Sequence, residues 1–350
     1  MRLQSLAILK TAFFLVITSF GGNAAEPSAR QQDAPPESRV EKTTPTSASL
    51  ILLGTAGGPV LRATRSQPAS MLVVNGIPYL IDAGDGVSEK VVKSGYSPAQ
   101  VRSVFVTHHH MDHTAGLGAF VAFNWSVVRK TPLHIYGPPG VEALVQRGLS
   151  YYAVSEETFG RQTPSPGKMA DIPKAVEISS DGKFYEDENI RVFAAENSHF
   201  SSGCQGKACT DLKSLSYRFE IKGGVKPLSI VFTGDTGPSE KVIELAKDTD
   251  VLVSEVIDLE STITFLRNNR RLPEATLQSM IAHMEMEHLT PDEVGKLAKS
   301  SGAKQLVLHH FVWGNHEREP DVKKITDAVA KIYSGPLIPG NDMQVITLRE

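Results

Sequence analysis

Long apolar runs, C-x-x-C cysteine pairs and an excess of basic residues are all missing from this 350-residue sequence. The most apolar stretch near its start, residues 11–20, is too short to span a bilayer. Because 36 Lys and Arg face 39 Asp and Glu, the chain has no overall positive field that would attract polyanions. A Gly-rich turn at residues 54–59 lacks the Lys-Ser/Thr pair that completes a phosphate-binding P-loop. These absences disfavour a membrane-anchored protein, a thiol-exchange enzyme and a P-loop protein.

The N-terminal segment has the composition of a secretory signal peptide. Arg2 and Lys10 precede the apolar stretch, and small residues follow it at positions 21–25. We expect residues 1–25 to be cleaved and the mature protein to be periplasmic or secreted; an N-terminal anchor is the alternative. Cleavage would change the formal net charge from −3 to −5, since 34 basic residues would remain against 39 acidic ones.

Composition also suggests how the rest of the chain is divided. Residues 26–48 are rich in Pro, Ser, Thr, Gln and charge, and we expect a disordered linker there. Residues 49–350 can bury a large core and are expected to form one compact domain. Cys204 and Cys209 are expected to form a disulfide, because exported chains often pair their cysteines and four intervening residues allow a small closed loop. A soft-metal pair is the alternative.

Four potential metal ligands lie close together after the β-branched and aromatic run at residues 104–106. Alternate side chains of an extended segment point the same way, so His108 and His110 can share one ion. Asp112 and His113 turn into the following segment and can serve a second ion. Imidazole and carboxylate suit zinc and related divalent metals, and a catalytic site must leave one position for water. The alternative, a tag-like surface cluster, is disfavoured by the interposed Asp and the preceding strand.

This H-x-H-x-D-H pattern resembles that of the metallo-β-lactamase superfamily, whose remaining ligands follow in a fixed order. Three polar residues occur here in that order, each just past an apolar run where a side chain leaves a sheet edge: His199 after residues 190–194, Asp235 after residues 228–232, and His310 after residues 306–308. The resemblance therefore implies seven ligands for two metal ions.

The resemblance implies an α+β fold, a four-layer αββα sandwich, and the alternation of strand-like and helix-like segments agrees with it. Expected strands cover residues 49–53, 71–74, 79–81, 104–106, 133–136, 190–194, 216–221, 228–232, 251–253, 306–308 and 343–348. Asn75-Gly76 predicts a two-residue hairpin turn. Expected helices cover residues 87–94, 140–149, 239–246, 291–300 and 321–333. Residues 151–175 are expected to form a long loop.

Five later motifs look like those of the tRNase Z branch, which also takes in arylsulfatase-like and phosphodiesterase-like hydrolases. They are Gly234-Asp235, Ser254-Glu255-Val256, Glu287-His288-Leu289-Thr290, Leu308-His309-His310 and Gly340-Asn341-Asp342. The resemblance, over residues 49–348, implies one zinc held by His108, His110 and His199, a second held by Asp112, His113 and His310, and Asp235 as the bridge between them.

The resemblance also implies roles for residues around the metals. Asp112 would orient or deprotonate the nucleophile. His288 matches a non-ligand His that assists the reaction and could act as general acid. Glu255 matches the Glu of the family's His-Glu-Ala-Thr segment, although Ser254 stands where that segment has its His. Asp82 would support the metal-binding loop.

Two features disfavour tRNA as the substrate. A tRNA-processing enzyme of this kind would carry a long basic arm between the third His and the bridging Asp, whereas only 35 residues separate His199 and Asp235. Export would also keep the protein away from tRNA, so we expect no nucleic-acid partner. Four aromatic residues are candidate contacts for an aromatic or apolar substrate, with core packing as the alternative: Trp125, Tyr151, Tyr152 and Phe159.

We therefore predict an exported binuclear-zinc hydrolase that cleaves phosphodiesters or sulfate esters of small molecules, aromatic ones included, by attack of a metal-bridging hydroxide. The alternatives are a lactonase or β-lactamase acting on a cyclic carbonyl substrate and, outside the enzymes, a metal-binding protein on the same fold. The expected partner is a small-molecule ester, with no membrane span after cleavage and with a homodimer allowed.

Overall fold

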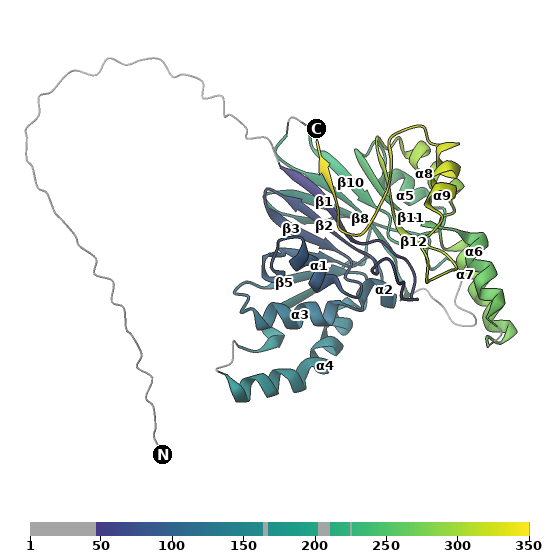
Figure 1. Ribbon diagram of the computed structural model, residues 1–350. Helices are drawn as coiled ribbons and strands as arrows, with labels where there is room; N and C mark the ends of the chain where they lie inside the picture. Colours follow the sequence, from purple (N-terminus) through teal and green to yellow (C-terminus); the bar gives the residue numbers. More distant parts are fainter. Residues whose placement is uncertain (1–46, 164–166, 202–210, 225, 270, 350) are drawn as a thin grey trace, which may run out of the picture. The chain divides into compact units, whose positions relative to one another are not determined.

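Two mixed β-sheets form the centre of the molecule (Figure 1). The computed structural model describes residues 47–163, 167–201, 211–224, 226–269 and 271–349, and these contain two sheets of seven strands each. The first has the order β14-β1-β2-β3-β4-β5-β6, from Gln344–Leu348, Ala48–Gly54, Ala69–Val74, Ile77–Ile81, Ser103–Phe105, Leu133–Gly137 and Pro173–Glu177. The second has the order β13-β12-β11-β10-β9-β8-β7, from Leu337–Pro339, Leu306–Val312, Val251–Ile257, Leu228–Phe232, Leu215–Ile221, Ile190–Glu196 and Gly182–Glu186.

Helices cover the outer face of each sheet. Three pack on the first sheet: α1 (Val87–Lys93), α3 (Leu117–Ser126) and α4 (Val141–Gln162). Three pack on the second: α5 (Glu240–Leu245), α8 (Pro291–Ser301) and α9 (Val322–Ala330). The short α2 (Met111–Thr114) follows β4, and the pair α6 (Leu259–Asn268) and α7 (Glu274–Met286) follows β11. Two 3-10 turns complete the list, η1 (Pro98–Gln100) and η2 (Met169–Asp171).

The buried side chains form three layers that match this arrangement. Between the sheets, Leu50 and Phe105 of the first meet Phe219 and Val307 of the second. A second layer joins the first sheet to its helices, and a third joins the second sheet to its own. Each central strand thus buries both faces, which explains why strands such as β10 have no polar side chain except Ser229. The four-layer αββα sandwich is confirmed.

Local signals in the sequence account for several boundaries. Asn75 and Gly76 have φ angles of 51° and 78°, so both central residues of the β2–β3 turn are left-handed, as a two-residue hairpin requires. The capping box of Thr290 and Glu293 begins α8, and Gly302, with a φ angle of 69°, ends it. These predicted elements are confirmed.

The predicted long loop at residues 151–175 is wrong. Helix α4 continues to Gln162, and η2 and β6 follow it. Along α4 only Val141 and Val145 are buried, because the second half of the helix lies on the surface. It therefore has little of the apolar periodicity by which a helix is recognised.

The N-terminal predictions lie largely outside the described residues. The signal peptide at 1–25 and nearly all of the linker at 26–48 fall there, as do Cys204 and Cys209. Among the described residues, no helix is long and apolar enough to cross a membrane. By contacts between Cα atoms, Thr43–Glu350 is one compact unit.

Candidate metal centre

The seven predicted metal ligands come together where the two sheets meet. The loop after β4 carries His108 and His110, and α2 carries Asp112 and His113. The other three ligands come from the second sheet: His310 lies in β12, His199 follows β8, and Asp235 follows β10. All seven lie in two groups whose candidate ligand atoms are within 4.8 Å of one another.

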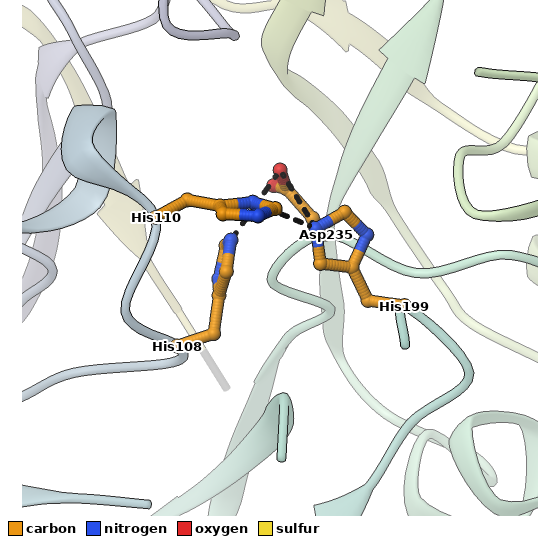
Figure 2. Close-up of side chains that lie close together, drawn as sticks. All are labelled: His108, His110, His199 and Asp235. Atoms are coloured by element: carbon orange, nitrogen blue, oxygen red, sulfur yellow. Dashed lines mark hydrogen bonds and ion pairs between the residues drawn. The ribbon is translucent and has the colours of Figure 1, made fainter. Parts of the chain in front are cut away.

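The first group contains His108, His110, His199 and Asp235, which point toward one another in Figure 2. Nε2 of His199 lies 3.1 Å from Nδ1 of His110. Oδ2 of Asp235 lies 3.8 Å from Nε2 of His108 and 3.9 Å from Nε2 of His199. Three imidazoles and a carboxylate oxygen thus surround one point.

The second group contains Asp112, His113, His310 and again Asp235. Nε2 of His113 and Nε2 of His310 are 3.2 Å apart. Oδ1 of Asp235 lies 3.2 Å from the former and 3.0 Å from the latter, and Oδ2 of Asp112 lies 3.3 Å from Nε2 of His310. Asp235 therefore presents one oxygen to each group, which is the position of a bridging ligand.

A bulge in β12 sets the direction of His310. In the pairing of β11 with β12, Ser254 opposes Leu308 while Val256 opposes Phe311, so the register shifts at this point. Such a bulge turns a side chain out of the alternating pattern. The extra residue lies in β12, where His310 takes a left-handed φ angle of 44°. Glu255 keeps the alternation of β11 and faces the same side as Val251 and Val253.

In three of the histidines, the ring nitrogen that does not face the other ligands lies within hydrogen-bond distance of an oxygen atom. Nδ1 of His108 lies 3.1 Å from the Thr107 hydroxyl, and Nδ1 of His113 lies 2.9 Å from Oδ2 of Asp82. Nδ1 of His199 lies 2.9 Å from the carbonyl oxygen of Glu287. A metal-binding His commonly donates its second N–H in this way, which turns the lone pair of the other nitrogen toward the ion. Asp82 thus lies where its supporting role requires.

The donor atoms fit divalent cations. Nε2 of His108 is buried and has no hydrogen-bond partner among the described residues, a costly state unless a ligand satisfies the atom. Burial lowers the pKa of His108 and of His199 well below the usual value, so both rings are neutral, as metal binding requires. Burial opposes ionisation of Asp235, yet His310 and His113 hold its pKa well below normal. The group therefore offers neutral imidazoles and an ionised carboxylate.

Glu255 and His288 form a buried pair beside the metal centre. Oε2 of Glu255 lies 2.7 Å from Nδ1 of His288. Burial and the charge of Asp235 raise the pKa of Glu255 well above normal, and burial lowers the pKa of His288. With both groups neutral, the Glu255 carboxyl O–H donates a hydrogen bond to Nδ1, and His288 carries its N–H on Nε2. The pairing agrees with the predicted general acid; the role itself stays a prediction.

Arg62 is a site residue that the sequence analysis missed. Its guanidinium lies 4.1 Å from the ring centroid of Trp313 and donates to the Trp313 carbonyl at 2.6 Å. Its Nε is buried and has no hydrogen-bond partner in the described part of the chain. Burial lowers the pKa of Arg62 to about 10, while the charge of Asp112 raises it. A cation therefore lies within the electrostatic reach of the predicted nucleophile-orienting residue.

His283 and Glu287 were also missed. His283 on α7 bonds through Nδ1 to the Glu287 carboxylate, and its ring centroid lies 5.3 Å from that of His199. The available signal was the spacing itself, since His283 and Glu287 are four residues apart on one face of a helix directly before His288.

The four aromatic residues predicted to contact substrate are placed differently from one another. Trp125 is buried in the layer between the first sheet and its helices, donates to the Gly167 carbonyl, and packs edge-on against Phe159. Tyr151 and Tyr152 line a cavity of about 370 Å³ between α3 and α4. For Trp125 the core-packing alternative therefore describes what is seen.

Comparison with known proteins identifies relatives over most of the chain. Residues 79–311 match the family model described as the β-lactamase superfamily domain. Ribonuclease Z of Methanosarcina mazei is 25% identical over 319 residues, which cover 85% of this chain and 97% of that enzyme. Ribonuclease Z of Pyrococcus abyssi is 28% identical over 282 residues, covering 75% and 85%.

Solved structures share the fold. The short form of human tRNase Z has a TM-score of 0.60 at 19% identity, covering 86% of this chain and all of that one. The metallo-β-lactamase-fold protein YhfI of Bacillus subtilis has a TM-score of 0.59 at 18% identity, covering 87% of this chain and all of that one. The zinc-bound PqqB of Methylobacterium extorquens has a TM-score of 0.56 at 14% identity, covering 86% and 100%.

These relatives contradict two predictions made from the sequence. Relatives named as ribonucleases argue against an exported hydrolase of small-molecule esters, and equally against the absence of a nucleic-acid partner. Both predictions depended on the expected export of the protein and on the short segment between His199 and Asp235. A missing arm removes one binding surface, but it leaves the hydrolytic centre itself unchanged. Localisation and a homodimer stay predictions.

Proposed function

Because the chain belongs to the β-lactamase superfamily and is a metal-dependent hydrolase of the metallo-β-lactamase fold, we propose that it hydrolyses phosphodiester bonds of RNA with two divalent ions, zinc first among them. The relatives named Ribonuclease Z support this substrate class, since the alignment with the Methanosarcina mazei enzyme covers 97% of its length.

The position of Asp235 is the observation that carries the proposal. Its Oδ2 faces the first group of histidines and its Oδ1 faces the second. The residues that would hold one ion are His108, His110 and His199, and those that would hold the other are Asp112, His113 and His310, with Asp235 shared. When bound, such a pair of ions supplies an activated water and neutralises charge on a phosphodiester.

The chain's own residues orient the reaction around that centre. Oδ2 of Asp112 accepts a hydrogen bond from the Gly58 amide at 2.9 Å, which fixes the carboxylate that would orient the attacking water. His288 carries an N–H on Nε2 because Glu255 holds its other nitrogen. That N–H can protonate the departing oxygen of the ribose while Nδ1 takes up the proton of the Glu255 carboxyl.

Arg62 supports an anionic substrate. No carboxylate of the described residues lies within 4.0 Å of its guanidinium, whereas the neighbouring Arg65 is paired with Glu319 at 2.7 Å. A half-buried cation with an unpaired Nε–H gains a partner when a phosphate enters.

The test uses two RNAs of equal length, a precursor tRNA with a 3′ trailer and an unstructured strand. Metal-loaded protein should cleave RNA, and Asp235→Asn should lose the activity. Asp171→Asn, at an exposed carboxylate in η2, is the matched control and should behave as the parent. Parent protein that holds two metal ions and hydrolyses bis(p-nitrophenyl) phosphate, yet cleaves neither RNA, would overturn the RNA substrate while leaving the metal centre in place.

A further inference from the structure

A cavity of about 370 Å³ lies between α3 and α4, beside the metal centre. Thr114, the last residue of α2, lines this cavity and directly follows His113. The Thr114 hydroxyl donates to the carbonyl oxygen of His110 at 3.0 Å, so the cavity wall is bonded to the loop that carries two of the metal-binding histidines. Because α2 has four residues, about 6 Å of helix, the cavity begins within about two stacked nucleotides of that loop, at about 3.4 Å each.

Two glycines bring the helix backbones together in the wall of the cavity. Gly118 of α3 and Gly148 of α4 both line it, and a Cβ atom at Gly148 would lie 3.4 Å from Cα of Gly118. A Cβ atom at Gly118 would lie 3.4 Å from Cε2 of Tyr152, so this ring packs over the glycine. Part of the wall is therefore bare backbone, against which a planar ring can lie.

Tyr151 and Tyr152 form an aromatic edge of the cavity. Their ring centroids are 5.0 Å apart and the rings are edge to face at 81°. Tyr152 is half-buried and packs on the core layer between the first sheet and its helices, whereas Tyr151 is 79% exposed. The inner ring thus supports an outer ring that is open to solvent. Such a ring is a stacking platform for nucleobases, because every base has a π-face.

Arg147 adds a positive charge to the same wall. It precedes Tyr151 by four residues on α4, so the two side chains lie on one face of the helix, and both line the cavity. Within the part of the chain that the structure describes, Arg147 has no ion-pair partner, whereas Arg161 on the same helix is paired with Glu157. An unpaired cation beside an exposed aromatic ring is the combination with which proteins bind single-stranded nucleic acid. The charge therefore favours a nucleotide over a neutral apolar ligand.

We propose that this cavity is a nucleobase subsite, in which a base close to the scissile phosphate stacks on Tyr151 while Arg147 neutralises the phosphate next to that base. The assignment deepens the proposed function and rests on it for the RNA substrate. It also gives the exposed half of α4 a role, since Val141 and Val145 are the helix's buried residues. Stacking reads no hydrogen-bonding edge, so the subsite accepts any base.

Two small molecules test the base contact without RNA. Adenosine 5′-monophosphate and ribose 5-phosphate share a sugar and a phosphate, and they differ in the base. Calorimetry on metal-loaded protein should show that the parent binds the nucleotide about tenfold more tightly, the effect of one stacked base. Tyr151→Ala should remove most of this difference at unchanged metal content, whereas Tyr151→Phe, which keeps the ring, should retain it. Ala119→Phe should also remove it, because the new ring fills part of the cavity from α3.

A third ligand tests Arg147. Adenosine 3′,5′-bisphosphate carries a second phosphate beside the same base, and the parent should bind it about tenfold more tightly than the monophosphate, as expected for one charge-assisted contact. Arg147→Gln should lose this second gain and keep the first. Equal affinity of the parent for the two nucleotides would refute the role of Arg147.

Phe123→Ala is the matched control, since Phe123 is a 50% exposed aromatic residue of α3 that does not line the cavity. It should bind all three ligands as the parent does. Equal affinity of the parent for the monophosphate and ribose 5-phosphate would overturn the subsite, and so would an unchanged difference in Tyr151→Ala. A shift from dimer to monomer in Tyr151→Ala, at unchanged nucleotide affinity, would assign this surface to a contact between copies of the chain instead.

The outcomes also separate this inference from the proposed function. Base-dependent binding in a protein that cleaves no RNA would support the subsite and contradict the RNA substrate. Cleavage of RNA by a protein that binds the monophosphate and ribose 5-phosphate equally would contradict the subsite alone.

Discussion

A substitution of Gly57 tests how closely the loop after β1 must approach the second metal group, Asp112, His113, His310 and Asp235. A Cβ atom at this position would lie 2.4 Å from both Cε1 and Nδ1 of His310 and 2.7 Å from Cγ2 of Val312. Carbon atoms in contact prefer about 3.5–4.0 Å, so His310 would have to move by about 1 Å. The loop has little freedom to recede, because the Gly57 amide donates to the Phe311 carbonyl at 2.8 Å. A displacement of about 1 Å in a reacting group typically costs about 100-fold in rate.

We therefore expect Gly57→Ala to lower kcat for bis(p-nitrophenyl) phosphate about 100-fold and to weaken binding of the second metal ion. Overpacking should cost about 1–3 kcal/mol of unfolding free energy, so the protein stays folded. Gly160→Ala is the control, since nothing lies within 4 Å of its added methyl group in α4, and it should stabilise the helix by up to about 1 kcal/mol. Parent-like kcat and metal content in Gly57→Ala would refute the reasoning, because His310 would then not depend on this approach.

Three other substitutions test separate parts of the account. Arg62→Gln should raise KM for a phosphodiester about tenfold at unchanged metal content, as expected for one charge-assisted contact with phosphate; an unchanged KM would place the guanidinium outside the substrate path. Burial alone would raise the pKa of Asp187, but hydrogen bonds from Tyr79 and Tyr185 hold this pKa below its ordinary value. The ionised Asp187 carboxylate therefore stabilises the fold fully above the ordinary Asp pKa, and this stabilisation is lost as pH falls through the lowered pKa. Asp187→Asn should destabilise the fold by about 2 kcal/mol at neutral pH. It should also flatten the acid limb of the pH dependence of stability, measured by urea unfolding. Asp342→Ala should cost about 3 kcal/mol, because Oδ1 and Oδ2 accept from the amides of residues 55 and 66 at 2.9 and 2.7 Å; a loss below about 1 kcal/mol in the same urea titration would contradict this.

The sequence alone predicted those structural features whose signal lies in neighbouring residues. Six of the seven predicted ligands follow apolar strands, and the resemblance to the superfamily supplied their assignment as ligands. His310 was expected just past residues 306–308, but β12 runs on to Val312, so His310 lies within the strand. The Asn75-Gly76 turn and the helix at residues 291–300 are equally local predictions, and both occur as expected. The fold class followed because two runs of such strands are separated by helices.

Contacts between distant segments could not be inferred in this way. Arg62 meets Trp313 across 251 residues, and no pattern near Arg62 indicates that approach. The bulge at His310 arises from the pairing of β12 with β11, so it too is a tertiary feature. His283 lies on α7, where only Ile281 is buried, and a helix with so few core positions gives a weak periodic signal.

The substrate prediction failed for a related reason. The substrate was predicted from the net charge of the chain and from the absence of a basic arm, and both describe the protein surface as a whole. Recognition of a phosphate depends on a few oriented groups near the metals, such as Arg62, and these groups contribute little to the composition. The relatives named as ribonucleases carried information that the composition lacked.

The central claim is that one carboxylate, Asp235, joins two metal groups into a single hydrolytic centre. The most direct measurement is anomalous scattering at the zinc edge from crystals of active, metal-loaded protein. The account predicts two peaks about 3.5–4 Å apart, one beside each oxygen of Asp235, and loss of both peaks in Asp235→Ala. A single peak in a fully active preparation, or two peaks that persist in Asp235→Ala, would contradict it.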